Sequence, residues 1–196
     1  MNPKLLFGTN NLHKLREIKE IVGDAYTLLS LADLGIDLEV EETENTLEGN
    51  AILKAKTYGE LAAMPCFADD TGLEVDALNG APGVYSARYA GEGCSFEDNV
   101  QKLLRELQGE DKRTARFRTV IAYYDGRKVH CFEGKVEGSI LQSPRGRGGF
   151  GYDPVFLPEG ASLTFAEMEP AAKNAISHRG RALKAFAHFL FNHSPH

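Results

Sequence analysis

Segments with strand patterns and segments with helix patterns alternate along this chain, and this alternation constrains the fold more than any other feature. Residues 4–7 are typical of a short strand, and residues 12–22 follow it with apolar side chains at helical spacing. Residues 114–124 and 128–141 indicate two long strands, because an Asp-Gly pair, a strong hairpin signal, joins them. Such alternation is typical of the α/β class, in which helices flank a sheet.

Further helices are predicted over residues 47–63, 95–107 and 171–191. The first and the last of these have apolar side chains that recur every three or four residues. The middle one opens with Ser95 and Asp98 at the spacing of a capping box. We expect the last one to be a single continuous helix.

Length, charge and cysteine content narrow the class of protein. The 196 residues suffice for one well-cored domain, folded as two lobes around a cleft. A net charge of −6 argues against broad binding to nucleic acid, which needs a basic face. The three cysteines lack metal-ligand spacing and are odd in number, which is typical of a reducing compartment. No apolar run approaches membrane-spanning length, so we expect a cytoplasmic protein with no membrane contact.

Two adjacent carboxylates, Asp69 and Asp70, follow a short apolar run at residues 64–68. The run is short enough for a buried strand, and Thr71 and Gly72 are expected to end it with a turn. Neighbouring side chains on a strand point to opposite faces, so one aspartate can face a cleft while the other braces the backbone or a second ligand. Such carboxylates, together with phosphate oxygens, suit Mg²⁺. A capped turn with solvated acids is the alternative interpretation.

Two familiar nucleotide-binding motifs are matched only in part. Residues 8–15 begin like a P-loop, but His13 stands where its second glycine belongs and Leu15 where its metal-binding hydroxyl belongs. Residues 146–151 match the GxGxxG pattern, yet Pro154 opposes the helix that a dinucleotide site requires. The first loop, with the helix amides after it, still suits an anion, although an ordinary strand-turn-helix with a surface lysine is the alternative.

Lys173, Ser177, His178 and Arg179 gather near the start of the last predicted helix. Cations at a helix start oppose the helix dipole, so these residues invite a ligand as explanation. A solvated helix face, with Arg179 paired to a nearby acid, is the alternative. The same alternative applies to Lys54 on its own helix.

Together these segments resemble the Ham1-like family of noncanonical purine nucleoside triphosphate pyrophosphatases, also called inosine/xanthosine triphosphatases. The resemblance covers nearly the whole chain. It rests on TNNLHK at 9–14, ET at 42–43, NAILKA at 50–55, ADDTGL at 68–73, GAPGVYSARY at 80–89, GGFGYDP at 148–154 and SHRG at 177–180. It implies Mg²⁺-dependent hydrolysis of ITP, dITP and XTP between the α- and β-phosphates, which releases the monophosphate and pyrophosphate.

The resemblance also implies roles for the residues around the phosphates. Glu42 and Asp70 would hold the metal, and Asp70 would also orient or deprotonate the attacking water. Asp69 would assist as a supporting neighbour or alternative acid. The triphosphate would be held by Thr9, Asn10, Asn11, Lys14 and Lys54, with Lys173 as a further cation and Thr71 close to phosphate oxygens.

A second group of residues would recognise the base. It comprises Phe150, Gly151, Tyr152, Asp153, Ser177, His178 and Arg179. Phe150 would stack on the purine, and the residues after it would contact the purine edge. Donors from His178 or Arg179 facing the 6-oxo group would favour hypoxanthine and xanthine over adenine, because adenine would leave buried polar groups unpaired.

Two positions depart from the family pattern. Asn10 stands where a glycine is usual, and asparagine tolerates a left-handed backbone better than most residues. Gly49 stands where a glutamate is usual, and Glu48, one residue round the helix, cannot simply replace it. The glycine at position 49 is expected to affect the affinity for Mg²⁺ or the catalytic rate.

We therefore expect an α/β fold with a long, mixed, twisted sheet, flanking helices and one catalytic domain, residues 1–196, whose two lobes surround a nucleotide-binding cleft. The resemblance adds a homodimer and a role in cleansing the nucleotide pool. Two alternatives stay open. One is a related pyrophosphatase with another base preference, such as modified pyrimidines, and the other is a catalytically silent nucleotide sensor.

Overall fold

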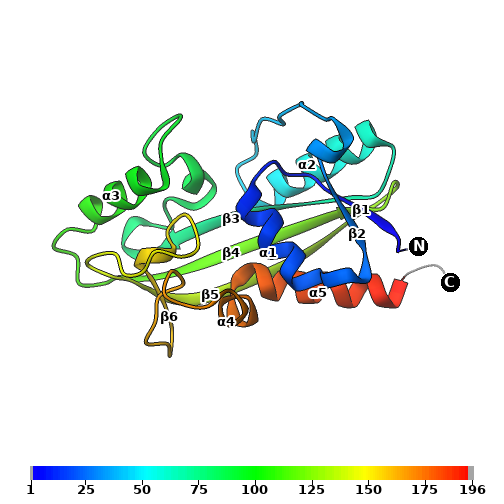
Figure 1. The fold of residues 1–196 in the computed structure, drawn as a ribbon. Helices are drawn as coiled ribbons and strands as arrows, with labels where there is room; N and C mark the ends of the chain where they lie inside the picture. Colours follow the sequence, from blue (N-terminus) through cyan, green and yellow to red (C-terminus); the bar gives the residue numbers. More distant parts are fainter. Residues whose placement is uncertain (1, 194–196) are drawn as a thin grey trace. The chain divides into compact units, whose positions relative to one another are not determined.

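The computed structural model describes residues 2–193, which form a mixed six-stranded sheet with flanking helices (Figure 1). In chain order the strands are β1 (Lys4–Phe7), β2 (Thr27–Ser30), β3 (Cys66–Val75), β4 (Thr114–Tyr124), β5 (Val129–Ile140) and β6 (Phe156–Pro158). The strand order in the sheet is β2-β1-β3-β4-β5-β6. Strand β1 pairs in parallel with β2 and β3, whereas β5 and β6 are antiparallel, which confirms the predicted mixed α/β sheet.

The helices are α1 (Leu12–Val22), α2 (Leu47–Ala62), α3 (Phe96–Glu106), α4 (Pro170–Ile176) and α5 (His178–His193). The first three confirm the predicted segments to within about two residues at each end. The capping box of α3 is present in full, with both the Ser95 and the Asp98 side chains bonded to the opposite backbone amide. Within residues 2–193, every helix is too short or too polar to cross a lipid bilayer.

The prediction of one continuous C-terminal helix is wrong. Ser177 has an extended backbone, with φ −66° and ψ 157°, and separates α4 from α5. Its backbone N–H donates to the Lys173 carbonyl at 2.8 Å and closes α4, while its side chain is buried. Serine competes with the helix backbone for hydrogen bonds and is favoured directly before a helix, so a break here agrees with its chemistry.

The predicted turn at Thr71 and Gly72 is also wrong. Strand β3 continues through both residues to Val75, with Thr71 half-buried and Gly72 buried. Strand β3 neighbours β4 in the sheet, and Glu74 forms an antiparallel bridge with Pro82, so pairing favours an extended backbone beyond Thr71. Threonine itself favours strands, and tertiary pairing overrides the turn preference of a single glycine.

The chain divides into two compact units, each with its own contacts. The first unit comprises residues up to Asp70, residues 119–134 and the chain from Arg179 onward. The second comprises residues 71–118 and 135–178. The boundary therefore falls inside β3, β4 and β5 and at the first turn of α5.

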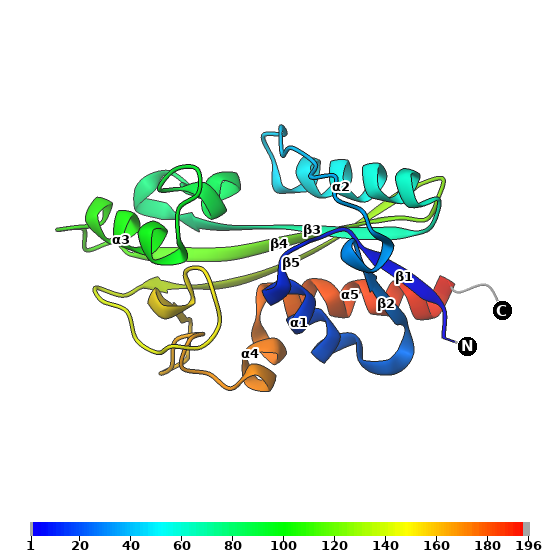
Figure 2. The ribbon, with the colours of Figure 1, turned by 45° about the horizontal axis from the view of Figure 1, so that its top comes forward.

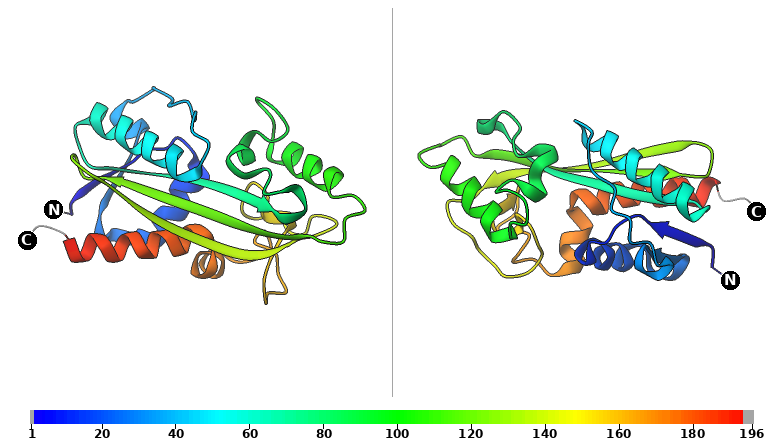
Figure 3. Two further views of the ribbon diagram at one scale, coloured as in Figure 1. Left: turned by 180° about the vertical axis from the view of Figure 1, so that it is seen from behind. Right: turned by 90° about the horizontal axis from the view of Figure 1, so that it is seen from above.

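The first unit has a core built on aromatic stacking. The rings of Phe7 and Phe67 are stacked with centroids 4.5 Å apart, and Phe186 of α5 packs on Phe67 at 5.2 Å. Within this unit α2 covers one face of β1 and β3, and α1 and α5 cover the other, as two views show (Figures 2 and 3). Helices on both faces explain why β3 starts as a continuous apolar run instead of an alternating pattern.

The second unit has a separate core. Its buried residues include Leu73 of β3, Leu103 of α3 and an aromatic cluster in which Phe117 lies 4.6 Å from Phe156 and 6.1 Å from Phe165. These residues come from strands on both sides of β4 and from α3, so the core forms only when distant segments pack together.

We expect Phe67→Ala to lower the free energy of unfolding by about 3–5 kcal/mol, because it removes a fully buried ring from the centre of the first core. Urea unfolding at neutral pH measures this change. The matched control is Phe191→Ala on α5, whose side chain is 66% exposed and whose loss should cost less than about 1 kcal/mol. Equal effects of the two substitutions would contradict the assigned core.

Candidate active site

Asp69 is a buried carboxylate that binds two cations in the first unit. Its Oδ1 accepts a hydrogen bond from Lys14 Nζ at 3.0 Å, and its Oδ2 accepts one from Arg179 Nε at 3.3 Å. Burial alone would raise the pKa of Asp69, but Lys14 and Arg179 hold that pKa well below its ordinary value. Asp69 therefore stays ionised near neutral pH. It is suited to anchoring the two cations and unsuited to exchanging a proton. Of its two predicted roles, that of a supporting neighbour therefore fits this environment better than that of an alternative acid.

Asp70, the next residue on β3, contacts a different group of residues. Its Oδ1 lies 3.8 Å from Lys54 Nζ, and its Oδ2 is buried without a hydrogen-bond partner among the described residues. Burial raises the pKa of Asp70 to about 6; Lys54 opposes this rise, and Glu42 adds to it. A buried carboxylate oxygen without a partner is costly, which makes Asp70 a candidate functional residue.

Lys54 of α2 joins the two carboxylates that were predicted as metal ligands. Its Nζ donates to Glu42 Oε1 at 3.1 Å and to the backbone carbonyl of Asp69 at 2.7 Å, besides lying near Asp70. Burial lowers the pKa of Lys54, but the carboxylates of Asp70 and Glu42 together raise it above the ordinary value. Lys54 thus stays charged and brings Glu42 and Asp70 to one place.

The loop at residues 9–14 is ordered by its own side chains. The Oδ1 of Asn11 accepts hydrogen bonds from the backbone N–H groups of His13 at 3.0 Å and Lys14 at 3.2 Å, which caps α1. Thr9 Oγ1 accepts a bond from the Asn11 N–H at 3.1 Å. Asn10 is not among the non-glycine residues of the described chain that have a positive φ. Asparagine at this position therefore carries no left-handed backbone strain. Phosphate binding by this loop stays a prediction.

Arg179 lies with the phosphate-side residues of the first unit. Its side chain is buried, and besides Asp69 it contacts Glu17 of α1 through Nη1. Arg179 is therefore paired with acids, as the alternative interpretation held, but it is buried and does not belong to a solvated helix face. With two nitrogens engaged by carboxylates, base recognition by Arg179 stays a prediction. The sequence analysis missed Glu17, although its position three residues after Lys14 places both on one face of α1.

Asp153 organises the predicted base-binding loop in the second unit. Its Oδ2 accepts hydrogen bonds from Lys173 Nζ at 2.7 Å and from the backbone N–H of Phe150 at 3.0 Å. The Lys173 ammonium also lies 5.0 Å from the centroid of the Phe150 ring. Gly149 has φ +66°, and a Cβ there would lie 2.1 Å from Asp153 Oδ2, so only glycine fits this turn. Gly151, after Phe150, also has a left-handed backbone, with φ +60°.

Two predicted base-contacting side chains are packed in the second unit. The Tyr152 ring lies in the core, and its hydroxyl donates to the Ser86 carbonyl at 2.7 Å. Burial raises the pKa of this phenol. The prediction that Tyr152 contacts the base therefore applies only to its backbone. The His178 ring is buried and stacked on Phe117, with centroids 4.6 Å apart.

A side chain at Gly49 would crowd its neighbours in this structure. A Cβ at Gly49 would lie 2.8 Å from the Cβ of Glu44 and 3.0 Å from Oγ1 of Thr46, the residue that caps α2. The side chain of Glu44 therefore occupies the space that a side chain at position 49 would need. The two residues form a matched pair in the segment that leads from Glu42 into α2.

The residues around Asp70 fit a hard divalent cation. The unpartnered Oδ2 of Asp70 and the carboxylate of Glu42 are both oxygen donors, and Lys54 Nζ contacts Glu42 and the other oxygen of Asp70, Oδ1. Residues 2–193 contain no cluster of three or more His, Cys, Asp or Glu with metal-binding geometry. Mg²⁺ needs only one or two carboxylates when waters and substrate phosphates complete its shell, so this donor set suits Mg²⁺ better than zinc.

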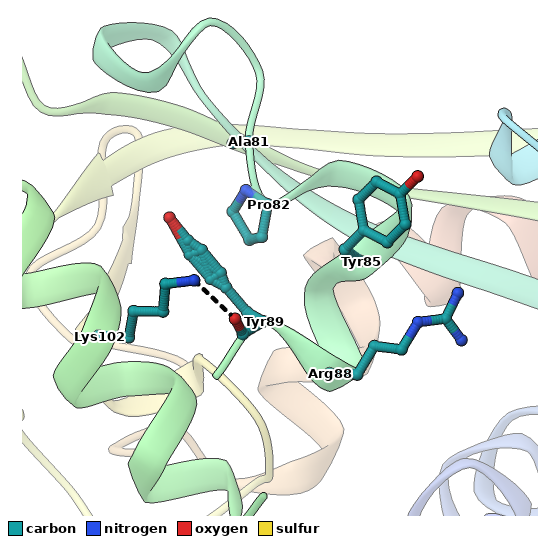
Figure 4. Close-up of a pocket in the computed structure, with 6 residues that line it drawn as sticks. All are labelled: Ala81, Pro82, Tyr85, Arg88, Tyr89 and Lys102. Atoms are coloured by element: carbon teal, nitrogen blue, oxygen red, sulfur yellow. Dashed lines mark hydrogen bonds between the residues drawn. The ribbon is translucent and has the colours of Figure 1, made fainter. Parts of the chain in front are cut away.

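A pocket in the second unit contains none of the predicted site residues (Figure 4). Its volume is about 390 Å³, and it is lined by Ala81, Pro82, Tyr85, Arg88, Tyr89 and Lys102. Lys102 Nζ donates to the Tyr89 carbonyl at 2.8 Å and lies 4.1 Å from the Tyr89 ring centroid. The Lys102 ammonium thus interacts with Tyr89, another residue of the pocket wall.

Buried carboxylates beside lysines, on an α/β sheet, are suited to holding a metal ion or an anionic ligand, as in a class of α/β enzymes. The profile of the Ham1 family matches residues 5–189, and the chain belongs to the Ham1 family. It is 53% identical over 188 residues to the dITP/XTP pyrophosphatase of Porphyromonas gingivalis, covering 95% of this chain and 97% of that protein. It is 48% identical over 189 residues to the dITP/XTP pyrophosphatase of Flavobacterium psychrophilum, with coverages of 96% and 100%.

Solved structures of the same family share the fold. The Ham1 protein of Staphylococcus aureus is 40% identical, has a TM-score of 0.88, and the match covers 96% of this chain and 98% of that one. A Ham1 protein of Coxiella burnetii is 37% identical, has a TM-score of 0.89, and the coverages are 97% and 99%. The family resemblance inferred from the sequence is thereby confirmed.

We expect amide replacement of the two aspartates to change stability in opposite directions in metal-free protein. Asp69→Asn should cost about 3–5 kcal/mol, because it removes the carboxylate partner of Lys14 and leaves the buried Arg179 with Glu17 alone. Asp70→Asn should stabilise the fold at pH 7 by about 1–3 kcal/mol, because it removes a charge that burial disfavours. Urea unfolding with EDTA measures both changes, and equal losses would contradict the different environments.

The pH dependence of these effects has a defined sign. The folded-state pKa of Asp70, about 6, lies above its ordinary value of 3.8, so its destabilising effect develops as the pH rises from about 4 to about 6. The pKa of Asp69 is lowered by folding, so its stabilising contribution is complete above that ordinary value and is lost as the pH falls below it. Unfolding of each variant across pH 3–7, compared with the parent, separates the two contributions.

A second substitution series tests the pairing of Glu44 with Gly49. Gly49→Ala should destabilise the protein by about 1–3 kcal/mol through crowding against Glu44. Adding Glu44→Gly should restore most of this loss, because it removes the clashing Cβ. Glu44→Gly alone is the control and should change stability by less than about 1 kcal/mol, since Glu44 is exposed. Additive effects in the double variant would contradict the pairing.

Proposed function

We propose that this protein is a nucleoside triphosphate pyrophosphatase that hydrolyses the noncanonical purine nucleotides ITP, dITP and XTP to the monophosphate and pyrophosphate. The observation that carries the proposal is the unpartnered, buried Oδ2 of Asp70 beside the Lys54–Glu42 pair. Relatives at about 50% identity that bear the name dITP/XTP pyrophosphatase support the substrate class.

Glu42 and Asp70 would hold Mg²⁺ through their carboxylate oxygens. When bound, this cation would neutralise charge on the phosphates and polarise the phosphorus that is attacked. Lys54, which contacts both carboxylates, would keep them in place and add its own positive charge next to the phosphates. The unpaired oxygen of Asp70 supports this assignment because a ligand would satisfy it.

In the proposed reaction Asp70 receives a proton from the attacking water. The oxygen of this water forms a bond to phosphorus at the linkage between the α- and β-phosphates, and the bridging bond breaks. The proton passes to the carboxylate of Asp70, and pyrophosphate leaves. Without a bound cation, burial raises the pKa of this carboxyl to about 6.

Lys14 and Lys54 would stabilise the negative charge that develops on the phosphate oxygens. Electrostatic groups fixed in advance are the main means of catalysis in phosphate chemistry. Asp69 fixes Lys14 through a hydrogen bond of 3.0 Å, and Thr9, Asn10 and Asn11 form the loop that leads to this lysine. Asp69 thus contributes by positioning the cation, and its ionised state supports that role.

The second unit would select the base. Phe150 would stack on the purine, while Lys173 and Asp153 keep its loop in place. A 6-oxo group on the purine would accept a hydrogen bond from a donor at this site, whereas the 6-amino group of adenine would leave that donor unpaired. His178, stacked on Phe117, supplies a ring held in one orientation for this purpose.

We further propose that the protein acts in the cytoplasm as a homodimer and removes noncanonical nucleotides from the nucleotide pool. The three cysteines without metal-ligand spacing support a reducing compartment, and the family resemblance supports the dimer. A silent nucleotide sensor has less support, because steric matching with Glu44 accounts for the missing glutamate at Gly49 without any loss of Glu42, Asp70 or Lys54.

One assay tests the proposed reaction. Pyrophosphate release should be rapid from ITP, dITP and XTP, slow from ATP, GTP and dUTP, and should require added Mg²⁺. Release of orthophosphate would contradict the cleavage position, and equal rates with ATP and ITP would contradict the base selection. Rapid release from dUTP would favour a pyrimidine enzyme instead.

Asp70→Asn should lower kcat by about 10²–10⁴-fold, because the amide cannot accept the proton from water. Asp111→Asn, which replaces an exposed aspartate, is the control and should keep the parent rate. Circular dichroism should show that both variants are folded. A near-normal rate for the folded Asp70→Asn variant would show that another group activates the water.

A further inference from the structure

The loop that carries Phe150 depends on a few contacts for its position. Residues 142–149 are all exposed, and three of them, Gly146, Gly148 and Gly149, are glycines. A glycine-rich backbone has many accessible conformations, so it does not by itself fix the ring of Phe150. The position of Phe150 is fixed by the hydrogen bond from its backbone N–H to Asp153 and by the side chains that contact its ring.

Phe96, the first residue of α3, contacts the Phe150 ring. The centroids of the two rings are 6.0 Å apart and their planes are inclined by 48°, within the favourable range for aromatic pairs. The ammonium of Lys173 lies 5.0 Å from the centroid of the same Phe150 ring. The ring is therefore held by a cation and by a second aromatic side chain.

Phe96 projects from a rigid support. Both hydrogen bonds of the capping box between Ser95 and Asp98 fix the helix start on which Phe96 stands. The buried Asn99 donates to the Ala87 carbonyl at 3.1 Å, which ties the same turn of α3 to the preceding loop. The side chain of Phe96 is nevertheless 44% exposed, so part of its apolar surface stays available beside Phe150.

We propose that Phe96 is a positioning residue of the purine site: it holds the Phe150 ring in the orientation that stacks on the base and extends the apolar surface beside it. This inference rests on the proposed function, in which Phe150 stacks on the purine. The residues proposed for the phosphate chemistry belong to the first unit, and Phe96 belongs to the second. Loss of Phe96 therefore weakens binding of the base and leaves the chemical step intact.

Steady-state kinetics of pyrophosphate release test the role of Phe96. Phe96→Ala should raise KM for XTP and dITP about three- to tenfold and change kcat by less than about twofold, as expected for the loss of one aromatic pair. The conservative variant Phe96→Tyr should keep the parent KM. Leu163→Ala is the matched control, because Leu163 is a large apolar residue of the second unit with 46% exposure and should leave both constants unchanged.

A double-mutant cycle tests whether Phe96 acts through Phe150. The variant with both Phe96→Ala and Phe150→Ala should have a KM close to that of Phe150→Ala alone, because a missing ring cannot be positioned. Independent, multiplicative increases in KM would show that Phe96 does not act through Phe150 and would overturn the inference.

A binding measurement that does not depend on turnover is available because the chain contains no tryptophan. Phe150→Trp introduces a single fluorophore at the stacking position. Inosine monophosphate should quench its emission, and adding Phe96→Ala should lower the fluorescence anisotropy and raise the Kd for inosine monophosphate about three- to tenfold. Unchanged anisotropy and Kd would overturn the positioning role.

The outcomes distinguish this inference from the proposed function. If Phe150→Ala leaves KM unchanged, base stacking by Phe150 is wrong, and the inference fails with it. If Phe150→Ala raises KM but Phe96→Ala does not, the inference about Phe96 fails and the proposed function stands. A fall in kcat at unchanged KM in Phe96→Ala would also overturn the inference.

Discussion

The site in the first unit depends on neutralising the buried carboxylate of Asp69. An ionised carboxylate in a protein interior is tolerated only when cations and hydrogen bonds compensate it, and Lys14 and Arg179 supply both. These partners come from α1 and α5, so one charge joins three elements that are distant in the sequence. Well-packed apolar residues could stabilise a core equally well. Function therefore explains better than stability why these charges are buried.

The second unit repeats this arrangement with different residues. Asp153 binds Lys173 and the backbone of Phe150, as Asp69 binds Lys14 and Arg179. In both cases a buried carboxylate fixes a lysine and a neighbouring segment before any ligand arrives. Asp70 differs, because one of its oxygens has no partner among the described residues. Two carboxylates are thus satisfied by the protein itself, and the third is left for water, metal or substrate.

The predicted helices and strands were correct where a local residue pattern decides the structure. They were wrong where strand pairing or a break within a helix decides it. Helix α3 was located from the capping-box spacing of Ser95 and Asp98, and the β4–β5 hairpin from an Asp-Gly turn, because these signals are local. Strand β3 was predicted to end at Thr71, since a glycine follows, but its pairing with β4 and the bridge from Glu74 to Pro82 keep it extended to Val75. Ser177 divides a helix whose apolar spacing continues across it, so periodicity could not reveal the break.

The sequence by itself determined the class of fold and the resemblance to the Ham1 family, and it predicted most of the charged residues of the candidate site. It could do so because strand and helix periods, capping residues and motif order are properties of neighbouring residues. Only the tertiary structure decided how these charges pair: that Asp69 binds Lys14 and Arg179, that Glu17 joins them, that Asp70 keeps an unpartnered oxygen, and that Glu44 fills the space at Gly49. The physical reason is that pairing, burial and steric fit depend on distances between segments far apart in the chain, which no local pattern contains.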